Sequence, residues 1–176
     1  MINVSPGVRR LCVCVGAPQP GLLDTACRIA GFGRLYTENV RAEGHDLGFA
    51  SPGVDEAALV VDMIAALHAA TAQWGGASGP ACGPALAAFH VGITRVEGDD
   101  LRGAAVTRIR ELLRNLALAV TSSGEAEEVL VVGISAGLFD DIRAECGFSD
   151  AWGPLASAGA WFRVYQANDA ALPADL

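Results

Sequence analysis

Hydrophobic and polar residues recur along the chain with two periods, one typical of strands and one typical of helices. Short apolar, often β-branched runs predict strands at residues 11–15, 35–40, 47–50, 86–96, 129–134 and 161–165. Apolar residues at helical spacing predict helices at residues 22–30, 54–74, 104–120 and 136–145. The two kinds of element alternate at irregular intervals, which favours an α+β fold with a mixed sheet over a doubly wound parallel sheet.

Glycine and proline separate these elements without marking a boundary between domains. Residues 16–20 read Gly-Ala-Pro-Gln-Pro and predict a loop. Residues 75–84 are rich in both and predict a mobile surface loop. They do not predict a domain linker, because neither side is large enough to fold alone. A length of 176 residues is typical of one domain.

Composition and charge exclude several classes of protein. The net charge of −8 leaves no broad cationic surface for nucleic-acid phosphates, and all twelve basic residues are arginine, so the chain contains no lysine. No apolar run reaches the roughly 18 residues of a membrane span, and residues 1–10 do not resemble a secretory signal. We therefore expect a cytoplasmic protein without nucleic-acid or membrane partners.

The cysteines do not predict a metal site. The chain has five, without zinc-finger or CxxC spacing, and an odd number favours reduced, buried thiols over a set of disulfides. Cys12 and Cys14 would share one face of a strand, because side chains two residues apart point the same way. Small core residues are the expectation for this pair, with a redox or metal-binding pair as the alternative.

Two adjacent segments carry a family resemblance. Residues 89–94, with the sequence FHVGIT, are followed by residues 98–107, with the sequence GDDLRGAAVT. They resemble the strand, the loop and the helix start, with its G-x-A-V-N motif, of class III nucleotide cyclase homology domains. Residues 128–132 with 135–142 are similar to the family's buried strand and following helix, and residues 161–165 to its C-terminal strand. Residues 52–70 resemble the helix after its second metal site, in the style of short cyclase-like domains from actinobacteria.

The resemblance spans residues 10–167 and leaves tails at residues 1–9 and 168–176. It implies a ferredoxin-like mixed or antiparallel sheet with helices packed on it. It also implies a role in signalling and a head-to-tail dimer, because the active sites of this family lie at such an interface.

Active members of this family hold two divalent ions with two aspartates, an arrangement that suits two-metal phosphoryl chemistry. The resemblance places the first aspartate at Gly16 or Ala17, neither of which can ligate a hard cation. The second falls on His45, or on Asp46 if the loop shifts by one residue. One carboxylate does not complete the pair, so we expect no metal site.

The remaining family positions are also altered. Thr107 stands where the family has asparagine, and Glu111 stands where it has arginine. Arg110 is one residue away, but one residue turns a helical side chain by about 100°. The base-recognising lysine is absent because the chain has none. We expect an inactive domain without catalytic residues or cofactor, acting as a protein-interaction or regulatory module, as a homodimer or with a related cyclase-like or signalling protein.

A rebuilt ligand pocket is the alternative interpretation. In it the chain is a sensor or an enzyme, and a nucleotide or small anion is bound by His45, Asp46, Thr107 and Arg110. Further arginines on the predicted 104–120 helix would add positive charge. Glu111 lies at helical spacing from Arg108 and Arg114, however, which favours a salt-bridged surface.

Two other polar positions have less specific interpretations. His90 lies inside an apolar strand and is expected to be a core histidine, not a metal ligand. Asp99 and Asp100 predict a solvated turn, with cation binding as the alternative. No Ser-His-Asp or Cys-His set is recognisable from spacing, although such sets assemble in space.

Overall fold

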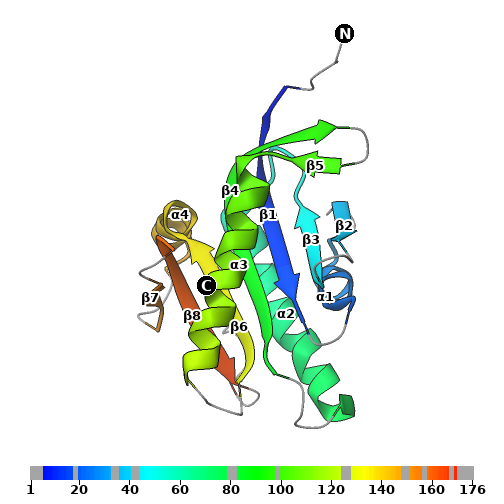
Figure 1. Ribbon diagram of the computed structural model, residues 1–176, viewed down its shortest axis with the longest axis vertical. Coiled ribbons are helices and arrows are strands. Elements are labelled where there is room, and N and C mark those ends of the chain that lie inside the picture. The colour runs from blue at the N-terminus through cyan, green and yellow to red at the C-terminus, as the bar shows by residue number, and fades with distance from the viewer. Residues whose placement is uncertain are drawn as a thin grey trace.

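A computed structural model describes residues 6–17, 20–32, 36–40, 44–78, 83–97, 100–123, 128–147, 151–155, 158–166 and 169. Its elements are β1 (Val8–Gly16), α1 (Leu22–Ile29), β2 (Tyr36–Val40), β3 (His45–Phe49), α2 (Glu56–Ser78), β4 (Ala85–Glu97), β5 (Asp100–Arg102), α3 (Ala104–Ser123), β6 (Glu128–Ser135), α4 (Ala136–Cys146), β7 (Gly153–Leu155) and β8 (Ala160–Gln166) (Figure 1). Every predicted strand and helix is confirmed, with ends that differ by a few residues.

The segment from β1 to β4 is a ferredoxin-like βαββαβ unit. Its strands lie in the order β2-β3-β1-β4, and each neighbouring pair is antiparallel. Helices α1 and α2 are the two connections, and they contact each other behind the sheet in Figure 1. The mixed α+β fold that the sequence predicted is therefore confirmed.

The rest of the chain widens this sheet on the β4 side. β6 lies parallel to β4. α3 lies between the two strands in sequence and packs across one face of the sheet. β8 and β7 follow as antiparallel strands. The parallel pairing ends where Phe89 lies opposite Ile134, but β4 continues as far as Glu97. The end of β6 and the start of α4 therefore lie beside the middle of β4.

Helices cover both faces of the sheet, with α3 in front and α1 and α2 behind in Figure 1. Each strand contributes alternate residues to the two sides, as a pleated backbone requires. In β1, Leu11 and Val13 pack with residues of α1, α2 and α4, whereas Cys12 and Cys14 pack with residues of α3. The prediction that these two cysteines share a face and are buried is confirmed.

One local prediction needs correction, and two short strands were not predicted. The loop predicted at residues 75–84 begins later, because α2 continues to Ser78. Extending an existing helix adds one hydrogen bond per residue, which offsets the unfavourable propensity of Gly75 and Gly76. β7 and β5 were not predicted because each is only three residues long. Pro154 is tolerated in β7, since β7 ends the strand order and an edge strand can include proline.

Candidate functional site

The end of β1 lies beside the start of β3, where the family resemblance placed the two metal-binding aspartates. The antiparallel register sets Gly16 opposite His45 and Val15 opposite Asp46. Val15 is almost fully buried, and Gly16 is the first residue of this stretch that solvent reaches. β1 therefore ends on a residue that has no side chain to offer a ligand.

Asp46 is engaged in a structural hydrogen bond on the α1 side of the sheet. Its Oδ2 accepts a hydrogen bond of 3.1 Å from the backbone N–H of Gly21, the residue that precedes α1. Gly21 has a φ of +88°, a conformation that glycine adopts without steric cost. The first N–H groups of a helix lack intrahelical acceptors, and the helix dipole favours a negative charge there. Asp46 thus ties the β1–α1 loop to β3.

His45 lies on the other face of β3, toward α3. A Cβ atom at position 16 would lie 3.5 Å from the His45 Nδ1 and 3.4 Å from a methyl group of Leu113. The half-buried ring therefore packs between the end of β1 and the middle of α3. Its Nδ1 is buried and has no hydrogen-bond partner among the residues that the structure describes.

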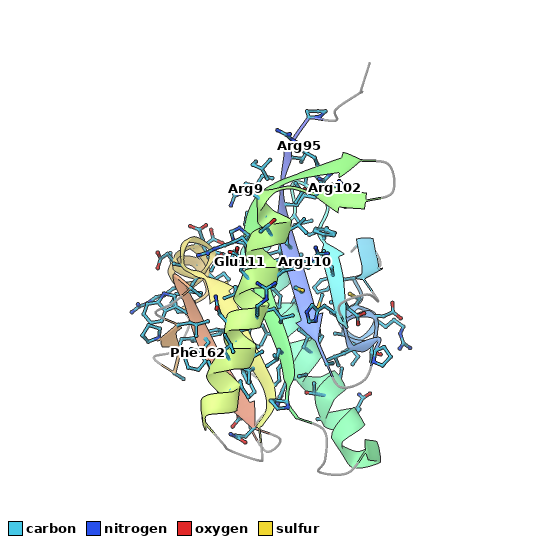
Figure 2. The ribbon with its side chains drawn as sticks, viewed as in Figure 1. Arg9, Arg95, Arg102, Arg110, Glu111 and Phe162 are labelled. Carbon is cyan, nitrogen blue, oxygen red and sulfur yellow. The ribbon has the colours of Figure 1, made fainter. Side chains whose placement is uncertain are left out.

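The remaining predicted residues lie on α3. Thr107 is exposed, and Arg110 and Glu111 are half-buried near the middle of the helix (Figure 2). Glu111 forms an ion pair of 3.5 Å with Arg108, so the predicted salt-bridged surface is present. The carboxylate at the family's arginine position is therefore paired within its own helix.

The four predicted ligand residues do not converge on one point. Neighbours on a strand point to opposite faces, so His45 faces α3 and Asp46 faces α1. Thr107 and Arg110 belong to α3, so of the two β3 residues only His45 is on their side of the sheet. Ligand binding by these residues stays a prediction. Within the described part of the chain, no three His, Cys, Asp or Glu side chains are grouped so that they could hold a metal ion.

Two adjoining pockets lie at the start of α4, away from the end of β1. One has a volume of about 440 Å³, and its polar lining comes from Arg9, His90, Arg108, Ser135 and Asp141. The other, of about 760 Å³, lies between α4 and the start of α2. Both are bordered by Arg9, Leu138 and Asp141, so the two lie side by side.

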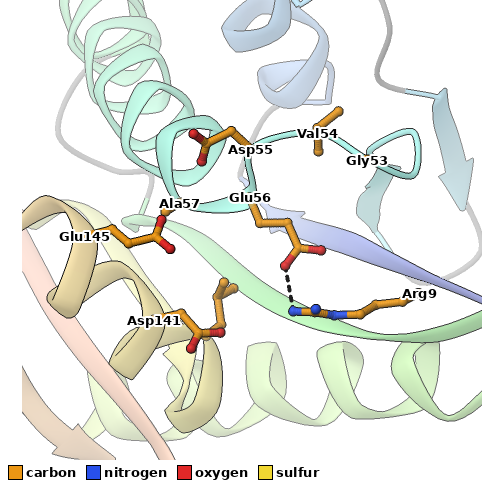
Figure 3. A pocket seen from close by; sticks show the side chains of 9 residues that line it. Arg9, Gly53, Val54, Asp55, Glu56, Ala57, Asp141 and Glu145 are labelled. Carbon is orange, nitrogen blue, oxygen red and sulfur yellow. Dashed lines mark hydrogen bonds and ion pairs between the residues drawn. The ribbon is translucent and has the colours of Figure 1, made fainter.

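The larger pocket is mostly acidic (Figure 3). Glu56 binds Arg9 at 2.7 Å, and Asp55 Oδ1 accepts a hydrogen bond of 3.0 Å from the Ala58 N–H at the first turn of α2. Asp141 and Glu145 face them from α4. Two of the four carboxylates therefore stabilise local structure, and an acidic cluster by itself does not define a site.

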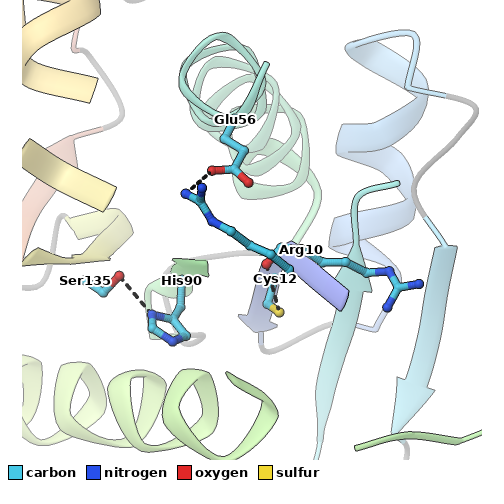
Figure 4. Close-up of polar contacts among 6 residues, drawn as sticks. Arg10, Cys12, Glu56, His90 and Ser135 are labelled. Carbon is cyan, nitrogen blue, oxygen red and sulfur yellow. Dashed lines mark hydrogen bonds and ion pairs between the residues drawn. The ribbon is translucent and has the colours of Figure 1, made fainter. Parts of the chain in front are cut away.

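The smaller pocket contains a close pair of polar side chains. His90 Nδ1 lies 2.9 Å from Ser135 Oγ (Figure 4). The parallel register of β4 and β6 brings them together, because Phe89 lies opposite Ile134 and the next residue of each strand is His90 and Ser135. Both side chains are half-buried and line the pocket.

Electrostatics keep this histidine neutral. Burial lowers the pKa of His90 from its usual 6.5, and the positive charge of Arg108 lowers that pKa further. Arg108 is held in place by Ala158, whose carbonyl oxygen accepts a hydrogen bond of 2.6 Å. Near pH 7 the imidazole therefore has one unprotonated nitrogen available as an acceptor or a base.

Sequence reasoning missed this pair. It assigned His90 to the core and assigned Ser135 no role. The available signal was Gly133-Ile134-Ser135-Ala136-Gly137, a serine between glycines at the junction of a predicted strand and helix. His90 and Ser135 are 45 positions apart in the sequence, and nothing in the intervening residues indicates that the two side chains meet.

Two cyclase structures are among the solved structures that share the fold. One is an adenylate/guanylate cyclase/hydrolase from Silicibacter pomeroyi, with a TM-score of 0.55 and 15% identity over 92% of this chain and all of that chain. The other is the catalytic core of a rhodopsin-guanylyl cyclase with converted specificity, in complex with ATPαS, with a TM-score of 0.58 and 13% identity over 94% of this chain and all of that chain. The chain has the fold of nucleotide cyclase domains.

At these identities the similarity establishes the cyclase-like fold and leaves the chemistry open. No family model and no curated protein sequence matches the chain. None of the described helices combines the length and the apolar character that crossing a membrane requires.

Proposed function

We propose that this cyclase-like domain does not form cyclic nucleotides and acts through protein contacts as a regulatory module in signalling. The observation that carries the proposal is the structure at the end of β1. Gly16 there lies opposite His45, and the carboxylate of the next residue, Asp46, binds the start of α1. A pair of metal ions needs several oxygen ligands at one point, and these residues supply them on neither face.

The residues on α3 support the same proposal. Active relatives use an arginine to stabilise charge on the phosphates, and a carboxylate repels such charge. Glu111 occupies that position and is paired with Arg108. Thr107 occupies the position of the family's asparagine and offers a hydroxyl where asparagine offers an amide. Its side chain is exposed.

A cyclase assay tests the absence of activity. Purified protein would be incubated with ATP or GTP in the presence of Mg²⁺ or Mn²⁺, with mass spectrometry of cyclic nucleotides as the readout. We expect no more product than heat-denatured protein gives. Product that grows with time and protein concentration in the native sample alone would contradict the proposal.

The partner surface is proposed to be the exposed side of α3. Leu118 is 63% exposed on this helix, which also carries Thr107 and Glu111. The resemblance places these two at site positions of the family, whose active sites lie at the dimer interface. Such a surface can persist after the chemistry is lost, in a homodimer or with a related cyclase-like or signalling protein.

Light scattering after size exclusion measures this association. We expect the protein to form a dimer, and Leu118→Glu to weaken it at least tenfold. Ile29→Glu is the matched control, because Ile29 is 44% exposed on α1, on the opposite face of the sheet. A strict monomer at high concentration that also captures no related domain, or equal effects of both variants, would count against the proposal.

A ligand pocket around His45 is the second candidate function. One observation favours it: the buried His45 Nδ1 has no hydrogen-bond partner among the described residues. A ligand hydroxyl or amide that binds this atom would remove the cost of leaving it unpaired. Thermal-shift screening with nucleotides, cyclic nucleotides and small anions tests it. Stabilisation of the native protein that His45→Phe abolishes would support a ligand site, and an unchanged melting temperature throughout would exclude these ligands.

A further inference from the structure

We propose that Ser135 and His90 form a nucleophile and base pair that hydrolyses small, negatively charged carboxylic esters. The pair lies outside the position of the cyclase site, in the 440 Å³ pocket at the start of α4. Nothing in this proposal depends on nucleotide binding or on dimer formation.

The position of Ser135 suits a nucleophile. It ends β6 and precedes the first residue of α4, within the sequence Gly133-Ile134-Ser135-Ala136-Gly137. A serine in a G-x-S-x-G sequence between a strand and a helix is the arrangement of many serine hydrolases, in which the turn presents Oγ to the substrate. The backbone at Ser135 is extended, with φ −62° and ψ 145°, and so differs from the sharp, strained turn of those hydrolases. Ser135 shares with them its place between a strand and a helix.

The hydroxyl is directed to His90 and not to the helix. Ser135 is the N-cap residue of α4, yet its side chain makes no capping hydrogen bond. Its Oγ instead lies 2.9 Å from His90 Nδ1, within reach for direct proton transfer. When the ring proton is on Nε2, Ser135 donates its hydrogen bond to Nδ1, and the same nitrogen accepts the proton when Oγ attacks.

Gly92 leaves the room that this ring position needs. A Cβ atom at position 92 would lie 3.1 Å from His90 Nε2 and 2.9 Å from the Cβ of Ala105. Glycine therefore allows the imidazole to lie close to β4 while Nδ1 faces Ser135.

Arg108 on the α3 side of the pocket favours a negatively charged substrate there, while Asp141 lines the α4 side. Arg108 lines the pocket from α3 and uses two of its nitrogens for Ala158 and Glu111. A guanidinium has five N–H donors, so further hydrogen bonds to a substrate carboxylate remain possible. Gly137 and Leu138, in the first turn of α4, also line the pocket, and the positive end of the helix dipole stabilises an oxyanion there.

The reaction balances with water as the only second substrate. Ser135 Oγ bonds to the acyl carbon while its proton passes to His90 Nδ1, and the ester C–O bond then breaks as the leaving alcohol takes that proton. Water attacks the acyl-serine with His90 accepting a proton, the acid leaves, and Ser135 regains its hydrogen. A pair without an orienting third group gives slow turnover, so the assay must detect the acyl-enzyme as well.

The test compares two esters of similar length, mono-p-nitrophenyl succinate and neutral p-nitrophenyl butyrate. We expect release of p-nitrophenol, with a mass increase on the Ser135 peptide. Ser135→Ala and His90→Gln should each lower the rate at least thirtyfold. Because the chain contains no lysine, non-specific acylation of surface amines is limited to the N-terminus. Ser51→Ala, at an exposed serine, is the matched control and should react as the native protein does.

Arg108→Gln separates substrate recognition from the reaction itself. It should raise KM for the succinate ester about tenfold and change the butyrate reaction much less. A fluorophosphonate probe on the native protein provides a second readout that needs no folded variant. Label on Ser135 supports the proposal, whereas absence of Ser135 label together with unchanged hydrolysis in Ser135→Ala would overturn it.

Discussion

Asp46 and Gly21, 25 residues apart in sequence, are joined by a 3.1 Å hydrogen bond from the Gly21 N–H to the Asp46 carboxylate. This contact fixes the start of α1 against β3. It also commits the only carboxylate of the 44–50 segment to a structural role on the face of the sheet opposite His45.

Removing this carboxylate should destabilise the fold. Asp46→Ala is expected to lower the free energy of unfolding by about 1–2 kcal/mol, because a helix N-terminus loses a charged acceptor. Asp46→Asn should lose less, since its amide oxygen still accepts. Urea denaturation measures both. Asp24→Ala, in the first turn of α1 but highly exposed, is the control and should cost less than about 0.5 kcal/mol. Equal losses at both positions would contradict the structural role.

Two glycines should respond in opposite directions to alanine. Gly92→Ala places Cβ 2.9 Å from the Ala105 Cβ and is expected to destabilise the protein by about 1–3 kcal/mol through overpacking. Gly137→Ala meets no atom within 4 Å and lies in α4, so it should stabilise the protein by about 0.5–1 kcal/mol. Chemical denaturation of both variants checks the prediction, which fails if Gly92→Ala is neutral.

Alkaline pH should destabilise the native state through its buried thiols. Burial raises the pKa of Cys12 from 9.0 to about 12, and burial with the charge of Asp24 raises the pKa of Cys27 to about 11. Above pH 9 the unfolded chain loses these protons and the folded chain keeps them. Stability is then full below pH 9 and falls by about 1.4 kcal/mol per pH unit for each group.

Denaturation between pH 9 and pH 10 measures this slope, to which tyrosine adds as the pH nears 10, because burial raises the pKa of Tyr165 from 10.0 to about 12. Cys12→Ala should have a smaller slope than the native protein, whatever its stability at pH 7. Cys146→Ala is a weaker test position, because its thiol is only partly buried. An unchanged slope in Cys12→Ala would show that Cys12 ionises in the folded state.

Acidification should destabilise the protein through His90. Its pKa is lowered in the folded state by burial and by Arg108, while Arg9 and Asp141 are the other charged groups lining its pocket. The unfolded chain binds a proton below pH 6.5 and the folded chain resists it. This contribution to stability is therefore complete above pH 6.5 and is lost as the pH falls through the lower folded value.

His90→Gln removes that pH dependence and retains a polar side chain of similar reach. Between pH 6.5 and pH 5 the native protein should lose more stability than this variant. NMR titration of the His90 ring provides a direct check. A midpoint at or above 6.5 would contradict the prediction and would also weaken the case for His90 as a base at neutral pH.

Most of the architecture followed from local pattern. The β-branched run at residues 129–134 and the helical spacing of Leu59, Met63 and Leu67 predicted β6 and α2, because period and burial are properties of neighbouring residues. β5 and β7 carried no such signal, since three residues are too few to show a period. The end of α2 was misplaced because the cooperativity of a long helix extends it through glycines that a local pattern assigns to a loop.

The sites depended on contacts between distant segments. Residue identity alone showed that Gly16, Thr107 and Glu111 lack the groups of an active cyclase, because side-chain chemistry does not depend on the fold. That His45 and Asp46 point to opposite faces depends on the register of β3 against β1. That His90 meets Ser135 depends on the parallel register of β4 and β6. Strand register is set by packing across the whole sheet, so residues far apart in sequence acquire their partners only when the sheet has formed.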